Sequence, residues 1–409
     1  MIPPGTAEQR VFLHVGAPKT GTTFVQTVLY HHRDALRGLG LLYPADEYDD
    51  HFFAAVDLQD LDFSGERRPE AQGRWEQVAA QVRAWPGTSV ISHDVLAGAT
   101  PEQARLAIES LAPAQVHIVC TARDLVHQLP SHWQEDVKHG QAADFDTWYA
   151  SIMRRDDSEW QFRWFWRAED IPDMLHRWAS KLPPEQVHVI TVPRPGAPVD
   201  VLWRRFAGVI GIRADSVDLH AVHHQNKGLG VAEVELIRRV NAAHAHIWSP
   251  RRYERDVKGV LAHEVLAEVT HTPRPRLPAR LLDEVADLAR GWAKDLEESG
   301  YDIVGDLGEL LPATRSAAAS SDVSSDEVDP EDVNEVAATA VFALLARLAE
   351  CRAAQQAEAD RLAAAHAIID EHRGLPPVER VKRTVVEIGR SNRAVGAALG
   401  VYRRLRRRT

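Results

Sequence analysis

The segment "VFLHVGAPKTGTTFVQ", residues 11–26, decides the fold class, because an apolar run, a glycine-rich turn and a helical pattern follow one another directly. The apolar run at 11–15 indicates a buried strand. The two glycines of the turn have the spacing of the G-x-x-x-x-G-K-[ST] phosphate-binding loop. Thr22, however, stands where that loop has its lysine, and Lys19 lies inside the loop instead. The turn is therefore predicted to bind an anion, but with its lysine at a different position from the lysine of the G-x-x-x-x-G-K-[ST] loop.

Short apolar runs separated by segments of helical length continue along the chain. They predict further strands at 41–43, 89–93, 116–122 and 187–192. The intervening segments are long enough for crossover helices, so we expect an α/β fold with a mostly parallel sheet, of the three-layer αβα, P-loop type. After Pro193 the pattern is helical, with helices predicted at 198–209, 230–245, 252–270 and 277–298.

The composition changes after this region. Residues 1–312 are expected to form the main domain, 313–332 a disordered acidic linker, and 333–409 a helical, basic C-terminal extension. Mostly apolar residues recur every seven positions in the extension. The second set of positions, which a coiled coil also needs to be apolar, includes Arg352 and Glu358. Docking of this helix on its neighbour is therefore favoured over a coiled coil. The heptad positions are Val341, Leu348, Gln355, Leu362 and Ile369.

The charge balance limits the partners. The net charge of −11 argues against general binding of nucleic acid, which needs a basic face. The last 39 residues are an exception, since eleven Arg or Lys residues and three Glu give them +8. Cys120 and Cys351 are too few for a disulfide framework or a metal cluster, and Cys120 is expected to be a small buried residue. With no signal pattern and no long apolar span, a cytoplasmic location is predicted.

The loop has the means to hold a phosphate. Backbone N–H groups and the positive end of the following helix face an anion bound there. The hydroxyls of Thr20, Thr22 and Thr23 are expected to donate to phosphate oxygens. Lys19 would lie at the bridging oxygen, which suits transfer of a sulfuryl group without an obligatory Mg²⁺. The alternative is a glycine-rich turn that only joins strand to helix.

The stretch "HVGAPKTGTTFVQ" resembles the phosphosulfate loop of sulfotransferases that use 3′-phosphoadenosine-5′-phosphosulfate (PAPS). The resemblance covers about residues 10–312 and includes "WFWRAEDIPDMLHRW" and "NKGLGVAEVELIRRVN", which are similar to bacterial members. It implies that the 5′-phosphosulfate contacts Ala17, Pro18, Lys19, Thr20, Gly21, Thr22 and Thr23. It also implies that an Arg after a later strand and a Ser eight residues on bind the 3′-phosphate; here these are Arg123 and Ser131. Lys227 resembles a further 3′-phosphate contact, with a solvated lysine as the alternative.

A proton acceptor is expected at the end of the third strand, in "VISHDVL". Asp94 and His93 are the candidates for the base. The alternatives are that Asp94 caps the next segment, that His93 is only a polar strand-end residue, or that neither acts. His51 is a weaker candidate for lining an acceptor pocket, and His14 is expected to be a core histidine with its hydrogen bonds satisfied.

The sequence thus predicts a bacterial sulfotransferase that moves the sulfuryl group of PAPS to an acceptor hydroxyl and releases PAP, with Lys19 assisting the leaving group. The aromatic segment "EWQFRWFWR" (159–167) is either core or an acceptor wall, and it favours a carbohydrate or glycolipid acceptor. A P-loop kinase and a PAP-binding scaffold that acts through its helical tail are the alternative functions. The basic tail would bind an anionic inner-membrane surface, the acidic core or a partner subunit.

Overall fold

Six parallel strands form one open sheet in the order β2-β3-β1-β4-β5-β6. The strands are β1 (Arg10–Gly16), β2 (Leu41–Leu42), β3 (Thr88–Ser92), β4 (Gln115–Ala122), β5 (Val187–Thr191) and β6 (Asp302–Val304). The first five coincide with the predicted strands, so the α/β class with a parallel sheet is confirmed. β6 was not predicted, because it has three residues and its side chains are only partly buried at the sheet edge.

The computed structural model describes residues 9–62, 68–155, 160–221, 228–244, 247–269, 272–312, 328–374, 381 and 384. The chain divides into two compact units, residues 1–340 and 341–409. The linker segment 313–327, Lys227 and most of the basic tail lie outside the described residues.

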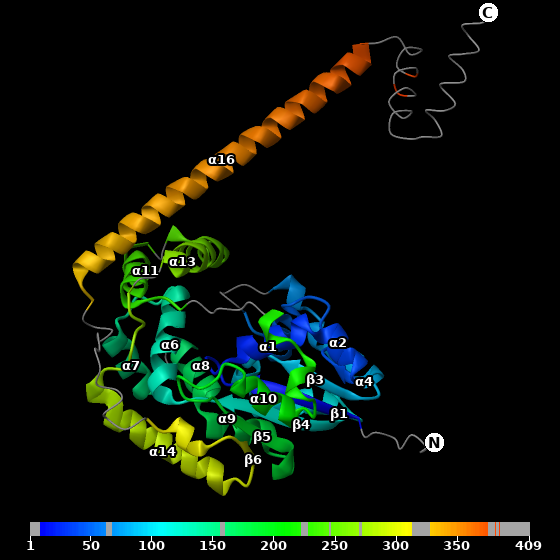
Figure 1. Ribbon diagram of the computed structural model, residues 1–409, viewed down its shortest axis with the longest axis vertical. Coiled ribbons are helices and arrows are strands. Elements are labelled where there is room, and N and C mark those ends of the chain that lie inside the picture. Colours follow the sequence, from blue (N-terminus) through cyan, green and yellow to red (C-terminus); the bar gives the residue numbers. More distant parts are fainter. Residues whose placement is uncertain are drawn as a thin grey trace, which may run out of the picture. The chain divides into compact units, whose positions relative to one another are not determined.

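Helices follow most strands of the first unit (Figure 1). They are α1 (Thr22–His31), α2 (Arg33–Gly38), α3 (Asp50–Gln59), α4 (Arg74–Ala84), α5 (Pro101–Ser110), α6 (Leu125–Lys138), α7 (Phe145–Met153), α8 (Trp160–Glu169), α9 (Ile171–Ala179), α10 (Val201–Val209), α11 (Val231–His244), α12 (Pro250–Tyr253), α13 (Ala267–Val269) and α14 (Leu282–Glu298). A π-helical segment, η7 (Glu254–Leu266), joins α12 to α13. The four helices predicted after Pro193 are therefore confirmed in position.

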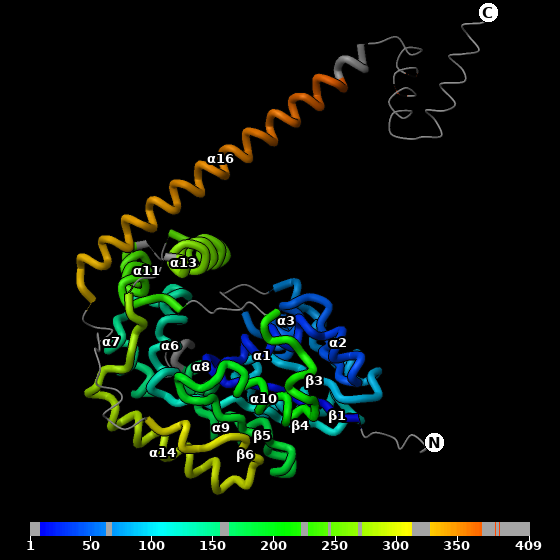
Figure 2. Tube along the Cα trace, in the orientation of Figure 1, coloured from blue at the N-terminus to red at the C-terminus, as the bar shows by residue number. Residues whose placement is uncertain are grey.

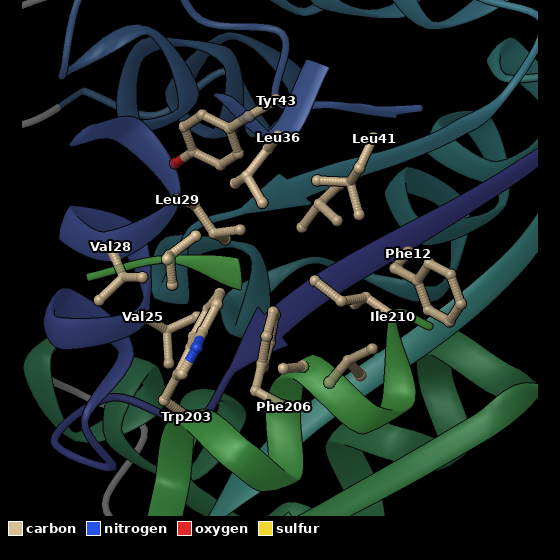
Figure 3. Close-up of a cluster of buried hydrophobic side chains, with 14 of the residues drawn as sticks. Phe12, Val25, Val28, Leu29, Leu36, Leu41, Tyr43, Trp203, Phe206 and Ile210 are labelled. Carbon is tan, nitrogen blue, oxygen red and sulfur yellow. The ribbon is translucent and has the colours of Figure 1, made fainter. Parts of the chain in front are cut away.

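Helices cover both faces of the sheet. On one face, Phe12 of β1 belongs to an apolar cluster with residues of α1 and α10, as Figure 3 shows for Val25, Leu29, Trp203 and Phe206. On the other face, α9 packs against β4, and its Met174 lies beside Gly16. Burial of these side chains on both faces explains why the strands are continuous apolar runs.

The order of the strands brings three loops together. β1 lies between β3 and β4 with all three chains running the same way, and His14 is level with Ser92 while Gly16 is level with Cys120. The carboxyl ends of these strands therefore meet at one edge of the sheet, where ligands of open α/β sheets bind. The loop that begins at Gly16, the pair His93-Asp94 and Arg123 all follow these ends.

The long helix α16 (Pro330–Gly374) begins in the first unit and continues into the second. Within the first unit its residues Val333, Val336 and Ala340 are buried. In the second unit the four apolar heptad positions, Val341, Leu348, Leu362 and Ile369, are exposed. Coiled-coil pairing and docking of this face both stay predictions. Among the described residues, no helix combines the length and apolar character that a membrane crossing requires.

Candidate active site

The turn after β1 leaves the start of α1 open. Gly21 precedes the first helical residue and has φ 87°, in the left-handed region. The backbone conformation therefore favours glycine here, and a Cβ atom on Gly21, at 2.6 Å from Leu202 Cδ2, would in addition displace the end of that side chain. No side chain caps α1, and its first turn carries no acidic residue. The positive end of the helix is thus available to an anion.

The three threonines of the turn have different surroundings. Thr22 and Thr23 line a cleft at the edge of the sheet. Thr20 is fully buried, and its hydroxyl donates to the carbonyl oxygen of Ala17 and contacts Thr121 Oγ1. The expectation that the Thr20 hydroxyl faces a phosphate is therefore wrong, because this side chain ties the turn to β4. Ala17 is also buried, and its N–H donates to Thr121 O at 3.0 Å.

The cleft has a volume of about 2050 Å³ and brings together most of the predicted site residues. Those that line it are Pro18, Lys19, Gly21, Thr22, Thr23, His93, Asp94, Arg123 and Ser131. Further lining residues come from 248–269 and 272–282, which include η7. Residues that are far apart in the sequence thus surround one space at the carboxyl edge of the sheet.

Lys19 does not stand alone in this cleft. Its Nζ lies 2.6 Å from Oε2 of Glu135, a residue of α6 that was not predicted as part of the site. Burial acts to lower the pKa of Lys19, but the carboxylates of Glu135, Asp94 and Glu169 together outweigh it and raise the pKa. Burial likewise opposes ionisation of Glu135, whose pKa is nevertheless held well below its usual range by Lys19, Lys138 and Lys258. Both groups are therefore charged at neutral pH.

Arg123 and Ser131 lie on the same side of the cleft. The Arg123 Nη1 donates to the carbonyl oxygen of Lys19 at 3.3 Å, so this arginine also supports the turn. The Ser131 hydroxyl donates to His127 O at 2.7 Å, one helical turn earlier in α6. A phosphate at Ser131 would have to take over this proton, which leaves the guanidinium of Arg123 as the stronger contact.

A second arginine that was not predicted, Arg274, lines the same cleft as Arg123. Its guanidinium carbon would be 3.4 Å from a Cβ atom on Gly228, and both residues line the cleft. The backbone around it is fixed, because Val231 N–H donates to Pro273 O at 2.8 Å. Burial, together with Arg274, lowers the pKa of Arg123. Two guanidinium groups that line one cleft and act on each other electrostatically indicate an anion site, although no spacing in the sequence links residue 274 to residue 123.

The loop before α11 is held against α6, beside which α11 lies (Figure 2). Gln134 Nε2 of α6 donates to Leu229 O at 2.9 Å, and Asn241 Nδ2 of α11 donates to Val137 O at 2.8 Å. Gly228 is therefore placed near the Arg123 side of the cleft. Lys227, the predicted third contact, lies outside the described residues and stays a prediction.

The two candidate bases differ in their hydrogen bonding. His93 is the N-cap of the short 3₁₀ helix at 94–98, and its Nδ1 accepts the Val95 N–H at 3.1 Å. Burial lowers its pKa, so the ring is neutral with its proton on Nε2 and has no free lone pair to accept another. Asp94 lines the cleft and does not cap this helix. The geometry thus favours Asp94 over His93 as the base.

Two further histidines are structural. His14 Nδ1 lies 2.7 Å from Ser92 Oγ and its Nε2 3.2 Å from Thr121 Oγ1, which confirms a core histidine with both nitrogens satisfied. His51 is buried as well, between Pro44 O and the Ser92 N–H. Burial lowers the pKa of each to about 4. The expectation that His51 lines an acceptor pocket is wrong, because its hydrogen bonds hold the chain after β2 to β3.

A buried polar network lies behind the turn. The Glu169 carboxylate, which is fully buried, accepts from Gln128 Nε2 and lies 2.7 Å from His132 Nδ1. Gln128 Nε2 also donates to Pro18 O at 3.1 Å. Burial acts to lower the pKa of His132, but Asp136 and Glu169 raise it. The two carboxylates thus favour the protonated form of His132, while burial raises the pKa of Glu169. The network fixes the turn next to Lys19.

The aromatic segment serves two purposes. Phe165 is a core residue, and Trp166 Nε1 donates to Ile152 O at 2.6 Å. Trp164 lines the cleft and packs over Gly98 so closely that a Cβ atom there would overlap its ring. Trp164 is thus an aromatic wall of the cleft, while Phe165 belongs to the core. The side chains of Trp160 and Phe162 lie outside the described residues.

Comparison with protein-family models, with curated proteins and with solved structures finds no significant match. Among the described residues, no three His, Cys, Asp or Glu side chains are grouped in a way that would hold a metal ion.

Proposed function

We propose that this chain is a PAPS-dependent sulfotransferase with a P-loop-type fold. One observation carries the proposal: Lys19, Arg123 and Ser131, which come from two different loop-helix segments, line the same cleft as the uncapped start of α1. An anion-binding turn before α1 next to the separate guanidinium of Arg123 suits a nucleotide with phosphate groups at both its 5′ and 3′ positions.

We assign the sulfuryl donor, PAPS, to the edge of the sheet where the carboxyl ends of β1, β3 and β4 meet. Its 5′-phosphosulfate is assigned to the backbone of residues 18–23 with the hydroxyls of Thr22 and Thr23, and its 3′-phosphate to Arg123, Ser131 and Arg274. Gly21 permits the close approach of the backbone that this requires.

The reaction proposed is a direct transfer. The acceptor oxygen forms a bond to sulfur as the bond between sulfur and the bridging oxygen breaks. The acceptor proton goes to Asp94, and the electron pair of the broken bond leaves with PAP. The Lys19 ammonium donates to the bridging oxygen as negative charge develops there, an interaction that is strong in a preorganised site. Lys19 has to turn from Glu135 toward this oxygen, so the ion pair at 2.6 Å competes with the catalytic contact.

Trp164 on the cleft wall supports a carbohydrate or glycolipid acceptor, because aromatic faces stack on sugar rings. The proposal is tested by a thermal-shift comparison of PAP, PAPS, ATP and ADP with and without Mg²⁺. We expect PAP and PAPS to stabilise the full chain without metal and ATP to have little effect. Stabilisation by Mg²⁺-ATP without any response to PAP would overturn the proposal in favour of a kinase.

A further inference from the structure

Three lysines converge on the single carboxylate of Glu135. Lys19 Nζ and Lys138 Nζ each lie 2.6 Å from its Oε2, and Lys258 Nζ lies 3.4 Å from its Oε1. Three ammonium groups and one carboxylate leave a surplus of two positive charges in this lysine cluster. All four residues line the cleft.

The cluster is partly shielded from solvent, with exposed side-chain fractions of 29% for Lys19, 11% for Lys138 and 23% for Lys258. Lys138 is the last residue of α6, and Lys258 comes from η7, which packs against α6. Like charges that are brought together in a partly buried place repel one another more strongly than they would in open water. Such an arrangement is stabilised by an anion.

The neighbouring groups respond to this surplus. Burial lowers the pKa of His139 to about 4, and the positive charge of Lys258 contributes to this shift. The pKa of His263 is also lowered, by burial first and by Lys138 second. Asp94 and Glu169 act on Lys19 and, together with Glu135, raise its pKa. Asp136 accepts from Trp148 Nε1 at 2.8 Å, and Glu254 pairs with Arg68. The pKa of Lys138 is nevertheless lowered, by burial and by Lys19 and Lys258, so positive charge stays in excess around Lys138.

We propose that Lys138 and Lys258 form an acceptor subsite for an anionic group, so that the molecule to be sulfated already carries a carboxylate or a sulfate ester close to its reacting hydroxyl. This inference rests on the proposed function, which places the transferred sulfuryl group at Lys19. Because Lys19 and the other two lysines share Glu135, the subsite adjoins the point of transfer. With Trp164 on the wall of the same cleft, an acidic or partly sulfated glycan fits best.

The binding experiment uses inorganic sulfate as the probe. The full chain, saturated with PAP, is titrated with sulfate by calorimetry at constant ionic strength, as wild type and as Lys138→Met, Lys258→Met and Lys19→Met. The control is Lys294→Met, which removes an exposed lysine of α14 that faces Glu298. We expect the dissociation constant for sulfate to rise about tenfold in Lys138→Met and Lys258→Met and to stay unchanged in the control.

Absence of sulfate binding to the PAP-loaded wild type would overturn the inference. So would binding that is lost only in Lys19→Met, because the ion would then occupy the sulfuryl position of the donor. If PAP itself fails to bind, the proposed function fails first, and this is seen before any sulfate is added.

A transfer assay identifies the acceptor class directly. The probes are 4-nitrophenyl β-D-glucuronide and 4-nitrophenyl β-D-glucoside, which differ only at C6, where the glucuronide has a carboxylate and the glucoside a hydroxymethyl group; transfer to the secondary hydroxyls that both share is compared. We expect kcat/KM to be about tenfold higher for the glucuronide, and this preference to disappear in Lys258→Met. Equal use of the two glycosides overturns the inference while leaving the sulfotransferase proposal intact. If neither is an acceptor, the sulfate titration decides.

Discussion

Lys19 Nζ lies 2.6 Å from Glu135 Oε2, although the two residues are 116 positions apart in the chain. This ion pair joins the turn after β1 to α6, the helix that also carries Ser131. Lys19 is itself in the left-handed region, with φ 61°, so its backbone is held in an uncommon conformation while its side chain is held by a carboxylate. The ammonium is therefore held at Glu135 in this structure and has to leave this carboxylate to reach the bridging oxygen of the proposed donor.

Replacing Lys19 with Met tests its role at the leaving oxygen. We expect turnover to fall about 10²-fold or more, because a preorganised charge that acts on the transition state is lost, while PAP affinity changes little. Single-turnover transfer of labelled sulfate and calorimetry with PAP measure the two quantities. Equal losses of PAP binding and turnover would contradict the role in the chemical step, and Lys294→Met should behave as wild type.

Asp94 and His93 are separated by a pair of conservative variants. Asp94→Asn should lower kcat by about 10²–10⁴-fold, because the amide cannot accept the acceptor's proton. His93→Asn should retain most of the activity, because asparagine also caps a helix and can accept the Val95 N–H. The measurement is kcat against pH for both variants. A large loss in His93→Asn with a small one in Asp94→Asn would reverse the assignment.

Arg274 is expected to act on the 3′-phosphate alone. Arg274→Met should weaken PAP binding about tenfold and leave AMP binding within about twofold, because AMP lacks the 3′-phosphate. The matched control is Arg194→Met, since Arg194 lines the same cleft but donates to Gly308 O at 2.6 Å. Calorimetry with both nucleotides measures the difference. The assignment of Arg274 to the 3′-phosphate fails if Arg274→Met weakens the binding of PAP and the binding of AMP equally.

The ion pairs of Glu135 predict a dependence of stability on pH. Its pKa is held well below 4.5 in the folded chain. The stability this carboxylate contributes is thus present above its unfolded pKa and is lost as pH falls through the lower folded value. Glu135→Gln should lower the free energy of unfolding by about 1–3 kcal/mol at pH 7, and this difference should shrink at pH 3.

Urea unfolding followed by tryptophan fluorescence gives both values. Glu298→Gln, which alters an exposed pair 3.8 Å from Lys294, serves as the control and should show little difference at either pH. A destabilisation by Glu135→Gln that is the same at pH 7 and pH 3 would show that the charge of Glu135 does not contribute to stability.

Much of the fold follows from local pattern. The strands at 11–15 and 116–122 were predictable because they are buried on both faces and therefore mostly apolar. β6 was not, since three residues at an edge carry too little pattern. The continuous helix α16 begins at Pro330, and the sequence gives its composition but no contact that would tell docking from pairing.

The site was predictable only where a residue follows a strand directly. Lys19, Asp94 and Arg123 were found in this way, because the topology brings strand ends to one edge. Glu135 and Arg274 reach the cleft from a helix interior and from a distant loop, so their positions depend on tertiary packing. The Thr20 hydroxyl was misassigned for a similar reason, since only the structure shows that Thr121 lies next to it.

The walls of the cleft come from separate parts of the chain. The turn at 17–23 and the segment from Arg123 to Lys138 follow the central strands β1 and β4, whereas further lining residues come from 248–269 and 272–282. Libraries confined to those later segments would therefore remodel one wall while sparing the sheet and its first loop. The architecture lends itself to laboratory diversification of one half of the cavity at a time.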